Sequence, residues 1–147
     1  MSTAAKLAAT RQAIATLLEK VDGVTKVYAY EPRDVPIGNQ PSASVWLDRI
    51  QRGGAEEAER RLGADDYLCD WIIRVQWEIA DPQRAQELFE LIGVNLRAVF
   101  DGEPLLDPNG VGVVDVSAIG EIRALLDLDR PIPMFMAEAT LQTLTII

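Results

Sequence analysis

The chain has 147 residues, of which 48% are hydrophobic, and its formal net charge at pH 7 is −9. These values are typical of one folded domain with its own core, and they exclude a disordered chain. No apolar run approaches the roughly 18 residues that span a bilayer, and the charges at Lys6 and Arg11 argue against a signal peptide. We therefore expect a single domain over residues 1–147 that is made in the cytoplasm and has no membrane partner.

The acidic balance also bears on nucleic acids. A protein that grips a duplex usually presents a basic face, because phosphate contacts supply much of the affinity. Here the lysines are only Lys6, Lys20 and Lys26, and the arginines are scattered. We expect no specific DNA binding, although an acidic surface would suit a passage through which DNA slides without sticking.

Residues 3–22 predict an amphipathic helix, because apolar side chains recur at helical spacing. That stripe consists of Leu7, Ile14, Leu17, Leu18 and Val21. Residues 24–31 predict a short strand, and residues 43–50 predict a second one after a loop rich in proline. On this second strand Trp46 falls on the more polar face, which makes it a candidate for an exposed contact.

Residues 67–79 show the clearest pattern in the chain, an alternation of apolar and polar side chains that predicts a long strand with one buried face. Trp71 and Trp77 belong to the apolar face and are expected in the core. Cys69, the sole cysteine, lies on the same face, where a buried and inert thiol is expected. One cysteine cannot form an internal disulfide.

The second half predicts a helix and further strands. Asp81 and Pro82 are typical N-cap and first-turn residues of a helix that should end near Phe100. The sequence DPNG at 107–110 predicts a type I turn. Strands are predicted at 111–118, at 121–126 after a kink at Gly120, and at 134–147.

This order, α-β-β-β-α-β-β with a kink at Gly120 that can split one strand, predicts an α+β fold in a single domain. The sheet should be antiparallel or mixed, with the helices packed on one face.

The most polar stretch, residues 51–66, is expected to be a loop or an arm that projects from the sheet. Its charges of both signs suit an interface between rotationally repeated subunits. With Trp46, the candidate subunit-interface residues are Arg52, Glu56, Glu57, Arg60, Arg61, Asp65 and Asp66.

The chain offers little material for catalysis. It contains no histidine, which removes the Ser-His-Asp and Cys-His arrangements and most zinc sites. Asp127 and Asp129 flank Leu128, but two carboxylates without a calcium-loop pattern do not make a metal site. We expect no enzyme activity, no catalytic residue, no cofactor and no metal.

The layout resembles the tail terminator proteins of long-tailed bacteriophages, which are also called tail completion or head–tail joining proteins. The matching features are the opening helix, the polar stretch before the strand YLCDWIIRVQWEIAD, the helix PQRAQELFELIGVNLRAVFDGEPL and the closing strand MFMAEATLQTLTII. The resemblance covers nearly the whole chain, rests on element order, and transfers no site residue.

This resemblance implies a structural virion protein, a hexameric ring that caps the tail tube and docks onto the neck. Its partners would be further copies of itself, the tail tube protein and the connector proteins. Three alternatives remain: another neck or minor tail subunit, a small binding module that uses the sheet face near Trp46, and an enzyme that uses carboxylates alone.

Overall fold

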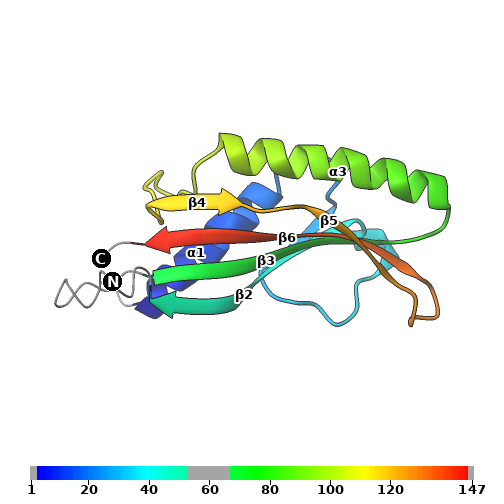
Figure 1. Cartoon of the computed structure of the whole chain (residues 1–147), viewed down its shortest axis with the longest axis horizontal. Helices are drawn as coiled ribbons and strands as arrows, with labels where there is room; N and C mark the ends of the chain where they lie inside the picture. Colours follow the sequence, from blue (N-terminus) through cyan, green and yellow to red (C-terminus); the bar gives the residue numbers. More distant parts are fainter. Residues whose placement is uncertain (1–2, 53–66, 146–147) are drawn as a thin grey trace.

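The computed structural model of the chain describes residues 3–52 and 67–145 (Figure 1). Its elements, in chain order, are α1 (Thr3–Leu18), β1 (Lys26–Tyr28), the 3-10 turn η1 (Ile37–Asn39), β2 (Ser42–Arg52), β3 (Tyr67–Glu78), α3 (Pro82–Gly102), β4 (Val116–Ile119), β5 (Arg123–Asp127) and β6 (Met134–Thr145).

The strands form one six-stranded sheet in the order β1-β2-β3-β6-β4, and β5 pairs with β6 beside β4. β1 runs parallel to β2, whereas every other pair is antiparallel. The predicted α+β fold with a mixed sheet is therefore confirmed. The split after Gly120 is confirmed too, because β4 and β5 pair with successive halves of β6.

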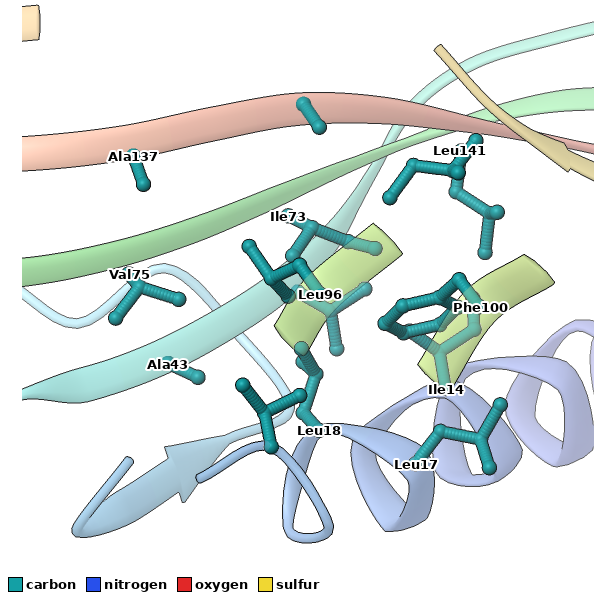
Figure 2. Close-up of a cluster of buried hydrophobic side chains, with 14 of the residues drawn as sticks. Ile14, Leu17, Leu18, Ala43, Ile73, Val75, Leu96, Phe100, Ala137 and Leu141 are labelled. Carbon is teal, nitrogen blue, oxygen red and sulfur yellow. The ribbon is translucent and has the colours of Figure 1, made fainter. Parts of the chain in front are cut away.

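β3 is the centre of the sheet and carries the alternation that the sequence predicted. Trp71, Ile73 and Val75 are fully buried on one face. Both helices pack on that face. Ile14 and Leu18 of α1 and Leu96 and Phe100 of α3 point toward the sheet and join its side chains in one core (Figure 2). Burying each such side chain stabilises the fold by roughly 1.5–3 kcal/mol, so this layer holds the domain together.

α3 begins where its capping residues predict. Asp81 is extended, and its carboxylate accepts a hydrogen bond from the Gln83 amide at 3.0 Å, while Pro82 starts the helix. These features satisfy or remove backbone donors that the first turn would leave unpaired. The helix buries Ile92 and Leu96 against the sheet.

The first helix is shorter than predicted, ending at Leu18 instead of residue 22. The chain tightens there, because the Lys20 amide donates to the Leu17 carbonyl at 3.0 Å and the Val21 amide to the Leu18 carbonyl at 3.2 Å. Gly23 follows with φ 98°, a left-handed conformation that glycine adopts without strain. Val21 is still buried, as the apolar stripe predicted.

Several strand boundaries also differ from the prediction, and β5, for example, runs from Arg123 to Asp127 instead of over 121–126. β2 extends through Gln51 and Arg52, which pair with Leu68 and Tyr67, so these two residues belong to the sheet and not to a loop. β1 is limited to three residues because only that much of the chain reaches β2. β4 starts at Val116, five residues later than predicted.

The late start of β4 has a local cause. The Asp107 carboxylate accepts hydrogen bonds from the amides of Asn109 and Val111, and the Gly110 amide donates to the Asp107 carbonyl at 2.9 Å. The predicted turn at 107–110 is thus confirmed. Residues 111–113 pair back onto residues 105–107, since the Asp107 amide donates to the Val111 carbonyl at 2.8 Å and the Val113 amide to the Leu105 carbonyl at 3.1 Å. The Asp115 amide is the first to reach β6, where it donates to the Leu144 carbonyl at 2.9 Å.

Candidate functional site

The sheet has an open face on the side away from both helices. Alternation along β3 places Leu68, Asp70, Ile72 and Arg74 on it, and register extends each position into a row across the sheet. The rows are Gln51–Leu68–Leu144–Val116, Arg49–Asp70–Gln142–Ala118, Trp46–Ile72–Thr140 and Ser44–Arg74–Glu138–Arg123. We call this surface the open face.

Arg74 organises the middle of the open face. Its guanidinium lies over the Trp46 ring, 4.9 Å from the centroid, and its Nη2 is 2.8 Å from a carboxylate oxygen of Glu138. Glu31 approaches the same guanidinium at 3.5 Å from the loop after β1. The side chain is only 24% exposed, so the charge is held between an aromatic ring and two carboxylates.

Arg49 and Asp70 form a second ion pair on this face, with Nη2 and Oδ2 2.8 Å apart. Arg49 reaches the face because the register of β2 against β3 shifts between Leu47 and Arg49. The extra residue, Asp48, is a β-bulge, which re-aims the side chains that follow it. Without this bulge Arg49 would point toward the helices.

Apolar side chains occupy the end of the open face near the start of β4. Leu68, Leu144 and Val116 stand side by side on three neighbouring strands. Val116 is 57% exposed. This apolar row beside the paired charges, together with the aromatic ring of Trp46, gives the open face the kinds of residue that protein contact areas contain.

The structure places only two of the predicted subunit-interface residues, Trp46 and Arg52. Trp46 lies on the more polar face of its strand, as predicted; it is half-buried there, and Arg74 covers its ring. The backbone of Arg52 is in β2. The remaining candidates lie outside the described residues: Glu56, Glu57, Arg60, Arg61, Asp65 and Asp66.

Sequence reasoning missed Arg74, Glu138, Arg49 and Asp70. They belong to no motif, and two charged residues separated by many positions give no sign that they will meet. The available signal was weaker: Arg74 and Glu138 occupy polar positions in the middle of long apolar strands, where a charge requires a partner.

Cys69 lies on the opposite, helix-facing side of β3 and is 2% exposed. Burial raises the pKa of its thiol, and the neighbouring Asp70 charge adds to that rise. A buried thiol with a raised pKa is a poor nucleophile, because the thiolate is the reactive form. The expected inert packing role agrees with this position.

A metal or a small ligand would need other features from the described residues. Asp127 is engaged by Arg130 at 2.9 Å and by the Asp129 amide, so its carboxylate supports the loop. Within residues 3–52 and 67–145, no group of three or more Cys, Asp or Glu side chains is arranged to hold a metal. A surface groove of about 490 Å³ lies between the loop before β2 and the turn before β6, and it is lined by apolar residues and by charges of both signs: Arg33, Asp34, Glu78 and Arg130.

Comparison with known proteins finds no family model that matches the chain and no curated protein with significant similarity to it. In the part of the chain that the structure describes, no helix has both the length and the apolar character needed to cross a membrane.

Proposed function

We propose that the protein is a structural subunit of a bacteriophage virion, which forms a ring that caps the tail tube and joins it to the neck. The observation that carries the proposal is the open face, where paired charges lie beside an apolar row. Such a surface favours contact with another protein over the binding of a small molecule.

The order of elements supports the choice of assembly. An opening helix, a long central strand, a second helix across the sheet and a long closing strand are the features in which the sequence resembles tail terminator proteins. In this role the chain performs no catalysis. Its partners are other copies of itself, the tail tube protein and the neck proteins, and DNA passes through the ring without specific binding.

Light scattering on the purified protein tests the ring directly. A 16.2 kDa chain that forms the implied hexamer should elute as one species about six times heavier. Electron microscopy of that species mixed with purified tail tubes should then show it at one end of the tubes. A stable monomer that does not bind tail tubes would contradict the proposal and favour the small binding module.

Additional measurements distinguish the terminator from another neck or minor tail subunit. A terminator should bind finished tubes and stop further addition of tube protein, which turbidity or microscopy of growing tubes can follow. A ring that binds only the connector, and leaves tube growth unchanged, would assign the chain to the neck.

A further inference from the structure

Strand β2 leaves most of one edge unpaired. β1 covers it only from Ser42 to Ser44, and no other described strand pairs along the outer side of residues 45–52. Ile50, in this free part, is 47% exposed. An unpaired edge presents backbone donors and acceptors that can pair with another chain.

Strand β4 forms the opposite edge at the same end of the sheet. It pairs with β6 on one side, and among the described residues no strand lies on its other side. Arg97 donates to the carbonyls of Ile119 and Gly120 at 3.2 Å and 2.8 Å, which covers only the end of this edge. Val116, at the start of β4, is exposed.

The two edges lie at the same level along the strands, and their strands run in opposite directions. Gln51 of β2 and Val116 of β4 belong to the same row across the sheet. β2 and β4 run in opposite directions, as their arrows show at the two edges of the sheet in Figure 1. A rotation about an axis near the strand direction keeps each strand's sense, so it would place β4 of the next copy antiparallel to β2.

The charges of the two sides are opposite. Strands β1 and β2 carry three basic residues, Lys26, Arg49 and Arg52, against one acidic residue, Asp48. The β4 side is formed by residues 98–122, which contain no lysine or arginine, so its basic group is Arg97, whose guanidinium lies on the carbonyls of Ile119 and Gly120. The acidic residues of this side are Asp101, Glu103, Asp107, Asp115 and Glu121. Within the chain, Glu103 is paired to Lys20, Asp101 to Arg97 at 3.9 Å, and Arg49 of the β2 side to Asp70.

We propose that copies of this chain associate head to tail, with the β2 edge of one copy against the β4 edge of the next. This inference rests on the proposed ring and names the surfaces that build it. Pairing β2 with β2 of a second copy, the two-fold alternative, would bring basic strands together, whereas the head-to-tail contact joins opposite charges. Rotational repetition of such a contact closes a ring.

Cysteine cross-linking tests the geometry. The variant Gln51→Cys/Val116→Cys places thiols at exposed positions of the two edges, in one row and on one face. After treatment with a flexible bis-maleimide, denaturing gels should show a ladder that extends beyond dimers. Each single variant should remain a monomer on the gel, and a mixture of the two single variants should give dimers only. The unmodified protein is the control, because Cys69 is buried.

The outcomes separate the inference from the proposed function. Dimers from Gln51→Cys alone, with no ladder from the double variant, would establish the two-fold contact and overturn the head-to-tail arrangement. A ring in light scattering with no ladder would also overturn it and leave the proposed ring in place. A ladder from a protein that does not bind tail tubes would support the contact and remove the tail function.

Discussion

Arg74 and Trp46 stack across two strands of the sheet, with the guanidinium carbon 4.9 Å from the centre of the indole ring. Arg74 also holds Glu138 on the next strand, so a single side chain connects β2, β3 and β6 on the open face. The centre of this face is therefore preorganised, and a partner that docks there would not have to order these side chains.

Replacing Arg74 by alanine should lower the free energy of unfolding by about 1–2 kcal/mol, because a cation–π contact and a half-buried ion pair are lost together. Urea denaturation followed by circular dichroism measures the change. Arg74→Lys keeps the charge but not the flat stacking surface, so an intermediate loss is expected. Arg123→Ala, at the exposed end of the same row, is the control and should change stability by less than about 0.5 kcal/mol. Equal effects of Arg74→Ala and Arg123→Ala would contradict the organising role.

Thr143→Val should cost about 1–3 kcal/mol, although the two side chains have nearly the same shape. The indole nitrogen of Trp71 donates to the Thr143 hydroxyl at 3.0 Å, and both residues are buried. Valine leaves this donor without an acceptor. Thr140→Val, on the half-buried open face, is the matched control and should be close to neutral in the same thermal or urea melt. A neutral Thr143→Val would show that the hydrogen bond contributes nothing net.

Asp81→Ala should destabilise the protein by about 1 kcal/mol, because the first turn of α3 loses its capping acceptor. Asp81→Asn should be nearly as stable as the unchanged protein, since asparagine caps as well as aspartate. The pair separates capping from charge, and a loss of stability in both variants would point to charge instead. Chemical denaturation midpoints give the comparison.

The Cys69 thiol should react slowly with a disulfide reagent such as DTNB at neutral pH, and quickly once the protein is unfolded. Ala118→Cys adds an exposed thiol on the other face and should give one fast phase beside the slow one. A fast reaction of the unchanged, folded protein would contradict the burial of Cys69.

The same group predicts a pH dependence. The folded-state pKa of Cys69 lies above its ordinary value of 9.0. The protonated Cys69 thiol therefore makes its full contribution to the free energy of unfolding below pH 9.0, and this contribution is lost as the pH rises through the folded-state pKa. Cys69→Ala should weaken the fall in stability between neutral and strongly alkaline pH, which melts at several pH values can detect.

The alternation of residues 67–79 was enough to predict the central strand and to place Trp71, Trp77 and Cys69 on its buried face. The cap at Asp81 and the turn at 107–110 were equally predictable. Each of these features depends on residues within a few positions of one another, whose spacing and backbone preferences act before any long-range contact forms.

The open face could not be predicted in this way. Arg74 meets Glu138 across 64 positions of sequence, and it meets Trp46 only because β2 pairs with β3 in one particular register. The bulge at Asp48 decides which face Arg49 occupies, and the pairing of β4 and β5 along one side of β6 decides which edges remain free. Strand order and register are settled by the packing of all layers together, because a shift of one residue would exchange the buried and open faces of a strand.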